Sequence, residues 1–84
     1  MATMEMTNEK AKKILEVQRR RQEKGHILPC PRCGHEMNPD LTMNALSRRV
    51  GVYICSRCGT EEAFEDMANA RMELKAWSLP QSFA

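Results

Sequence analysis

Four cysteines in two matching segments are the chemically distinctive feature of this 84-residue sequence. They occur in Cys30-Pro31-Arg32-Cys33-Gly34 and in Cys55-Ser56-Arg57-Cys58-Gly59. Two residues between paired cysteines allow both sulfur atoms to reach one ion from a tight turn. Two such turns supply the tetrahedral four-thiolate set that zinc takes in closed structural sites. The glycine after each second cysteine permits a left-handed or open backbone at that point. The spacing therefore predicts one metal site built from two distant parts of the chain.

Two other uses of four cysteines are compatible with this spacing. Two disulfides would require an oxidising compartment, and the sequence carries no signal for one. A four-thiolate iron site would make the protein an electron carrier similar to rubredoxin, a family that surrounds its metal with aromatic rings. Only Tyr53 lies close to a cysteine pair in the sequence. We therefore expect zinc and keep iron as a distant alternative.

The residues around the second cysteine pair predict a strand and then a helix. Val50, Val52 and Ile54 occupy alternate positions and indicate a strand that leads into the pair. Thr60 can cap a helix that follows directly. Residues 61–77 are its strongest candidate, because apolar residues recur there at spacings of three and four and so share one stripe. These residues are Ala63, Met67, Ala70, Leu74 and Trp77.

Another helix is expected ahead of the first cysteine pair. Residues 9–24 contain no glycine or proline, which favours a helix. Thr7 or Asn8 can cap its start, and Gly25 can end it. Its apolar face is narrow, so we expect this helix to pack only lightly against the rest. Together these elements predict a small metal-stabilised α+β domain with one helix on each side of the metal site.

The cysteine pattern resembles that of zinc ribbons, in which two cysteine-bearing turns at hairpin tips hold one zinc ion. The resemblance covers roughly residues 27–60 and implies a two-knuckle ribbon. A helix is predicted directly after the second turn, in place of the returning strand of a full ribbon. The segments 44–48 and 52–63 are similar to small zinc-ribbon proteins of phages and mobile elements in gut bacteria. The resemblance implies one structural zinc ion with four ligands: Cys30, Cys33, Cys55 and Cys58.

Length and targeting signals restrict the class of protein. The chain is long enough for one domain, which we divide into a basic helix (1–26), the ribbon (27–60) and an amphipathic helix with a tail (61–84). No apolar run could span a bilayer, and the first residues lack a secretory signal. We therefore expect a cytoplasmic protein without membrane association. Four thiolates would leave no open position for zinc catalysis, so we do not expect an enzyme.

The predicted helix over 61–77 supplies the favoured binding surface. A ribbon is too small to cover a stripe of this length, so the distal part is expected to meet a partner at Leu74 and Trp77. Tryptophan is a favoured interface anchor. We favour a protein-interaction module, an accessory or regulatory factor of phage or mobile-element origin, with inhibition of a host protein as one form of that role. The same helix could also join two copies of the chain.

Nucleic-acid binding is the alternative function. The formal charge is +5 over residues 1–59 and −3 over residues 60–84, and a basic stripe can bind phosphates. Single-strand binders usually interleave cations with aromatic side chains, which are scarce near the arginines here. Arg32 occupies the same place in its cysteine turn as Arg57, and both could instead offset the negative charge of the metal site. The candidate phosphate contacts are Arg19, Arg20, Arg21, Arg48, Arg49 and Arg57.

Overall fold

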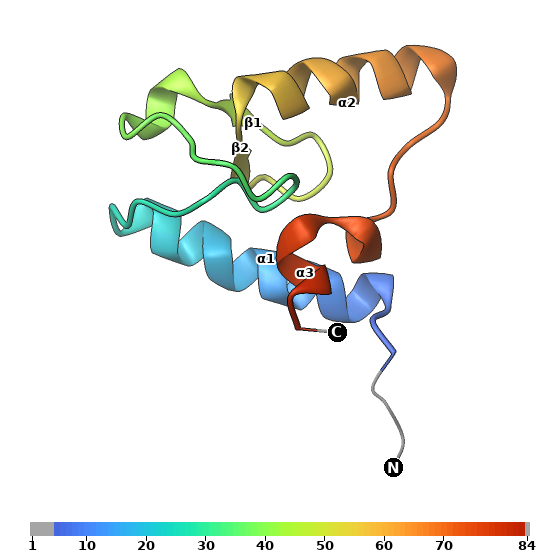
Figure 1. The fold of residues 1–84 in the computed structure, drawn as a ribbon, viewed down its shortest axis with the longest axis horizontal. Coiled ribbons are helices and arrows are strands. Elements are labelled where there is room, and N and C mark those ends of the chain that lie inside the picture. The colour runs from blue at the N-terminus through green and yellow to red at the C-terminus, as the bar shows by residue number, and fades with distance from the viewer. Residues whose placement is uncertain (1–4, 84) are drawn as a thin grey trace.

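The computed structural model describes residues 5–83, which fold into a small α+β structure. A two-stranded antiparallel sheet lies between α1 and α2, and the C-terminal segment returns to pack against α1 (Figure 1). In this part of the chain, no helix combines the length and the apolar character needed to cross a bilayer. The elements are α1 (Asn8–Glu23), a 3-10 turn (Leu41–Met43), β1 (Ala45–Leu46), β2 (Tyr53–Ile54), α2 (Ser56–Ala68), a 3-10 turn (Leu74–Ala76) and α3 (Ser78–Gln81).

The helix α1 has the predicted ends. The hydroxyl of Thr7 accepts a hydrogen bond from the backbone N–H of Lys10 at 3.2 Å, so Thr7 caps the start. Gly25 follows the last turn with φ of +89°, a backbone conformation that favours glycine. The prediction of a helix over 9–24 is confirmed to within one residue at each end.

The expectation that α1 packs only lightly is wrong. Ala11 and Leu15 are fully buried, and two glutamines on the same face are buried with them. The side-chain amide of Gln22 donates to the Tyr53 carbonyl at 3.0 Å and accepts from the Tyr53 N–H at 2.9 Å. Gln18 donates to the Pro29 carbonyl at 3.0 Å. Polar side chains thus extend the narrow apolar face and fasten α1 to the backbone of β2 and of the first cysteine segment.

The predicted strand is shorter than expected. Only Tyr53 and Ile54 are paired, with Ala45 opposite Ile54 in an antiparallel register. The residues before them form a turn, which the Ser47 N–H closes by donating to the Val52 carbonyl at 2.8 Å. The alternation still holds in part, because Val52 and Ile54 are both fully buried.

The predicted helix over 61–77 is wrong at both ends. α2 begins at Ser56 and ends at Ala68, so it crosses the predicted boundary between the ribbon and the C-terminal helix. Asn69 adopts a left-handed conformation with φ of +53°, which stops the helix. The chain then leaves the α2 axis and runs back to α1 (Figure 1). The stripe from Ala63 to Trp77 therefore does not exist as one surface.

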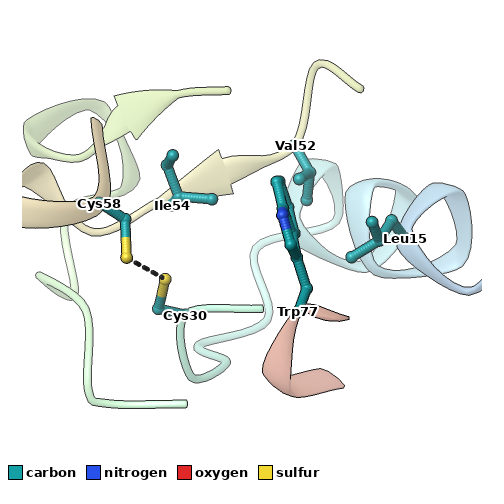
Figure 2. Packing of buried hydrophobic residues seen from close by; sticks show 6 residues of the cluster. All are labelled: Leu15, Cys30, Val52, Ile54, Cys58 and Trp77. Atoms are coloured by element: carbon teal, nitrogen blue, oxygen red, sulfur yellow. Dashed lines mark hydrogen bonds between the residues drawn. The ribbon is translucent and has the colours of Figure 1, made fainter. Parts of the chain in front are cut away.

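The core explains why the chain turns back. Figure 2 shows the indole of Trp77 next to Val52, with Leu15 of α1 on one side and Ile54 on the other, and 1% of the tryptophan is exposed. A helix continued past Ala68 would carry this large apolar side chain away from that position. The core cluster consists of Leu15, Cys30, Val52, Ile54, Cys58 and Trp77.

Candidate metal centre

The structure brings the four cysteines into one cluster. Their sulfur atoms all lie within 4.8 Å of one another. The Sγ atoms of Cys30 and Cys58 are 3.8 Å apart, and those of Cys33 and Cys55 are 3.7 Å apart. Tetrahedral coordination with metal–sulfur bonds of about 2.3 Å places neighbouring sulfurs about 3.8 Å apart. A disulfide would require about 2.05 Å, and all four cysteines are free. The residues present therefore fit a four-coordinate metal ion.

The first cysteine pair is held by a tight turn. The Gly34 N–H donates to the Cys30 carbonyl at 2.8 Å, and Gly34 has φ of +82°, as the sequence predicted for this glycine. The start of α3 supports the turn from outside, because the backbone N–H of Leu79 donates to the Pro31 carbonyl at 2.9 Å. The C-terminal segment, which contains the buried Trp77, therefore also supports the first pair of ligands.

The second cysteine pair lies in the first turn of α2. Cys55 is the cap of that helix, and its sulfur accepts from the Cys58 N–H at 3.5 Å. A second turn at a hairpin tip is not what the structure contains, so the two-knuckle ribbon is not confirmed. The two segments differ in backbone conformation at their glycines: Gly34 is left-handed, whereas Gly59 is helical.

Gly59 has a different reason to be glycine. A Cβ atom at this position would overlap the Cβ of Ala45, because α2 crosses β1 at close range. The prediction of a left-handed or open backbone at both glycines is therefore correct only for Gly34, because Gly59 is helical. At Gly59 the missing side chain allows the helix that carries the second ligand pair to approach the sheet.

The thiols occupy unequal environments. Burial raises the pKa of Cys58, and it also raises the pKa of Cys30. Burial opposes ionisation of Cys33 as well. Hydrogen bonds from the His35 backbone and from the neighbouring thiols nevertheless lower the pKa of Cys33 to about 6. The sulfur of Cys30 also accepts from the Cys55 N–H at 3.3 Å. Negative charge at this cluster is thus partly stabilised by the backbone, and a cation would stabilise it further.

The two arginines of the cysteine turns have different surroundings. Arg32 is buried, pairs with Glu61 at 2.7 Å and also pairs with Glu65. Burial alone would lower its pKa, but hydrogen bonds to Glu61 and to the Cys58 sulfur raise it. Arg57 is exposed and lies 3.8 Å from Glu61. Arg32 therefore joins the first cysteine turn to α2 and offsets charge at the cluster, and it is not available to phosphate.

The arginines proposed for nucleic acid do not form one free stripe. Arg48 pairs with Asp66 at 3.0 Å, and Arg49 pairs with the same carboxylate at 2.9 Å. The sequence placed these cations and the acidic residues of α2 in separate regions, but the fold pairs them. On α1, Arg19 lies 4.0 Å from Glu23, while Arg20 and Arg21 are exposed. α1 and α2 lie on opposite sides of the sheet (Figure 1).

The exposure expected along the 61–77 stripe is reversed. Trp77 is 1% exposed, so the expectation that it faces a partner is wrong. Leu74 is half-buried and packs against the core cluster. Phe64 and Met67, near the start of the predicted helix, are 64% and 83% exposed. Because the helix ends before Asn69, the start of the predicted stripe is exposed and its distal end is buried.

Sequence reasoning missed the buried polar residues that position the centre. Gln18 and Gln22 continue the spacing of Ala11 and Leu15, so the helical period was a usable signal for them. Glu62 is 2% exposed and accepts from the Ser47 hydroxyl at 2.7 Å, which ties α2 to the turn between the strands. Nothing local distinguishes Glu62 from the exposed Glu61 beside it.

Comparison with known proteins adds no relative. No protein-family model matches the sequence, and no curated protein or solved structure matches it significantly. The site is thus defined by its own geometry: four free cysteines, from one turn and one helix start, that lie close enough together to hold one metal ion.

Proposed function

We propose that this protein is a small zinc-stabilised module that binds another protein. The observation that carries the proposal is the cysteine cluster, in which this chain supplies four sulfur atoms that all lie within 4.8 Å of one another. Such a site is closed, and closed sites are structural. Binding zinc contributes on the order of 10–16 kcal/mol in small peptides, compared with roughly 5–15 kcal/mol for the net stability of a domain. The ion would therefore hold the fold, and the surface would do the binding.

Zinc is favoured over iron on chemical grounds. The spacing of the sulfur atoms suits either metal, but a given site binds zinc more tightly than ferrous iron. When bound, the ion would supply a fixed tetrahedral link between the first cysteine turn and the start of α2. Elemental analysis of protein purified under reducing conditions should find one zinc per chain and a colourless solution. A coloured protein with stoichiometric iron would instead support the electron-carrier alternative.

Protein binding is favoured over nucleic-acid binding by the distribution of partnered charges. Arg48, Arg49 and Arg57 already have carboxylate partners on α2. Large apolar side chains are exposed on both sides of the molecule, including Val17 and Met67. An accessory or regulatory role, a phage or mobile-element origin and inhibition of a host protein have the sequence resemblance as their only support.

The experiment is affinity capture with zinc-loaded protein, with and without nuclease treatment. A protein that is retained after nuclease treatment, and is lost from metal-depleted bait, supports the proposal. Retention that disappears with nuclease treatment would support the nucleic-acid alternative. Sedimentation of the bait alone identifies self-association, which would make a second copy the partner.

A further inference from the structure

Two adjoining hollows between α1 and the C-terminal segment form one groove. They have volumes of about 300 Å³ and about 340 Å³, and both are lined by Ile14 and Phe83. We call this surface the α1 groove. Its apolar lining comes from Met6, Ile14, Val17, Leu79 and Phe83.

Residues 5–83 leave part of the apolar lining of the groove exposed. Val17 is 48% exposed and Phe83 is 65% exposed. The inner face of α1 already packs on the core through Leu15, and the adjacent face with Ile14 and Val17 is left at the edge of the short helix α3. Apolar groups brought together in this way mark an interaction site more often than single exposed residues do.

The rim of the groove is positively charged. Lys10, Lys13 and Arg21 line it, and none of them has an ion-pair partner within residues 5–83. One carboxylate, that of Glu5, lies at one end of the groove. The arginines near α2 contrast with these cations, because acidic residues of the same chain already neutralise them. The groove therefore combines an apolar floor with unneutralised cations, which is complementary to an acidic amphipathic segment.

The shape of the groove selects a helix as the occupant. From Lys10 to Arg21 the groove follows α1 for about 16 Å, which is about three helical turns. Its walls are side chains of α1, of α3 and of the flanking residues Glu5, Met6 and Phe83. Within residues 5–83 they include no free strand edge, so an extended peptide could not add to a sheet here. Phe83 is the one aromatic side chain among the residues within 5–83 that line the groove, which favours a protein over a nucleic acid, whose bases would need stacking partners along the groove.

We propose that the α1 groove binds an acidic amphipathic helix of a partner protein. The inference rests on the proposed function as a protein-binding module and names its binding surface. Apolar side chains of the partner, spaced three or four residues apart, cover Ile14, Val17 and Phe83. Acidic side chains that flank them meet Lys13 and Arg21.

The test uses an unbiased library of 16-residue peptides displayed on phage and selected against the zinc-loaded full chain. The selected sequences should share acidic residues and apolar residues at helical spacing, and the synthetic peptide should bind more weakly as salt rises. Val17→Asp should weaken binding at least tenfold, because it places a carboxylate on the apolar floor. Met67→Asp is the matched control, since Met67 is exposed on α2, and it should leave the affinity unchanged.

The charge on the rim has its own matched pair of variants. Arg21 lines the groove, whereas the neighbouring Arg20 does not. Arg21→Glu should reduce affinity for the selected peptide at least fivefold, and Arg20→Glu should change it less than twofold. Far-ultraviolet circular dichroism and zinc content establish that each variant is folded.

Each outcome decides the proposal. If selected peptides bind the Val17→Asp variant with normal affinity and fail to bind the Met67→Asp variant, that result would refute the α1 groove as the binding surface and would leave the proposed function standing. A selection without any enriched peptide, together with salt-dependent binding of a labelled single-stranded DNA, would overturn both. Selected peptides that are basic, or that bind equally at low and high salt, would refute the charge complementarity.

Discussion

Replacing Trp77 with alanine should remove a large part of the stability of the zinc-loaded protein. Trp77 is 1% exposed and packs in the core with Leu15, Val52 and Ile54. Its ring nitrogen is buried and finds no hydrogen-bond partner within the described residues, so truncation breaks no hydrogen bond there. The effect should therefore come from packing alone.

The magnitude follows from the buried area. A buried tryptophan removes about 150–250 Å² from water, which at about 25 cal/mol per Å² gives roughly 4–6 kcal/mol as an upper value. Large aromatic-to-alanine substitutions in protein cores cost about 3–5 kcal/mol. A small domain has about 5–15 kcal/mol in total. We expect Trp77→Ala to lose about 3–5 kcal/mol and to remain folded only marginally.

The measurement is urea unfolding followed by far-ultraviolet circular dichroism, with free zinc buffered to the same level because bound metal adds to apparent stability. Phe64→Ala is the control, since Phe64 is 64% exposed, and it should change stability by less than about 0.5 kcal/mol. Trp77 is the only tryptophan, so wild-type fluorescence reports on this site alone. Its emission should be blue-shifted and poorly quenched by iodide.

A tryptophan on the surface would behave differently. Iodide would quench the fluorescence readily, and Trp77→Ala would unfold at the same urea concentration as the wild type. Either result would refute the core position of Trp77 and the return of the chain after Asn69. It would also restore the sequence-based expectation of an exposed helical stripe.

The remaining predictions concern the metal centre and its supports. Chelation of the metal should unfold the zinc-loaded protein cooperatively, and an unchanged circular dichroism spectrum would contradict a structural ion. Burial raises the pKa values of Cys30 and Cys58 in the fold, and in an unfolded chain a thiol keeps its ordinary pKa of about 8.5, so near neutral pH both must lose a proton to bind zinc. Zinc binding should therefore release at least two protons, and affinity should fall about a hundredfold per pH unit on acidification. Calorimetry in buffers of different ionisation enthalpy measures the number of protons released, and a release of fewer than two would contradict the prediction. Gly59→Ala should lower the stability of the protein by more than about 1 kcal/mol, because the new Cβ overlaps β1. Alanine favours a helix more than glycine does, so a stabilised variant would argue against the close approach of α2 to β1. Gln22→Leu should cost about 1–3 kcal/mol because the N–H and C=O of Tyr53 lose their partner, and unchanged urea unfolding would exclude that role.

Features that depend on neighbouring residues could be predicted from the sequence. The capped start of α1 at Thr7 and its end before Gly25 follow from side-chain and backbone preferences within a few residues. The two short cysteine pairs indicated the four ligands, because two residues between paired cysteines let both sulfurs face one ion, and the structure gathers all four. The alternation of Val52 and Ile54 also gave the correct buried face.

The course of the chain after α2 could not be predicted in this way. The residues from Ala63 to Trp77 have a real helical period, so local reasoning favours one helix. The fold instead breaks at Asn69, because burial of Trp77 beside Leu15 requires the tail to return to α1. That gain depends on a contact between residues far apart in the sequence.

The pairing of polar groups belongs to the tertiary structure alone. Gln22 and Tyr53 are 31 residues apart, yet the glutamine satisfies both backbone groups of the strand residue. Arg49 and Asp66 likewise meet only in the fold, which neutralises a cation that sequence reasoning had assigned to phosphate. The local sequence determined which segments form turns, which form helices and which carry the metal ligands. Long-range packing decided which polar and apolar groups are covered and which are left for a partner, because burial depends on what the rest of the chain brings to each surface.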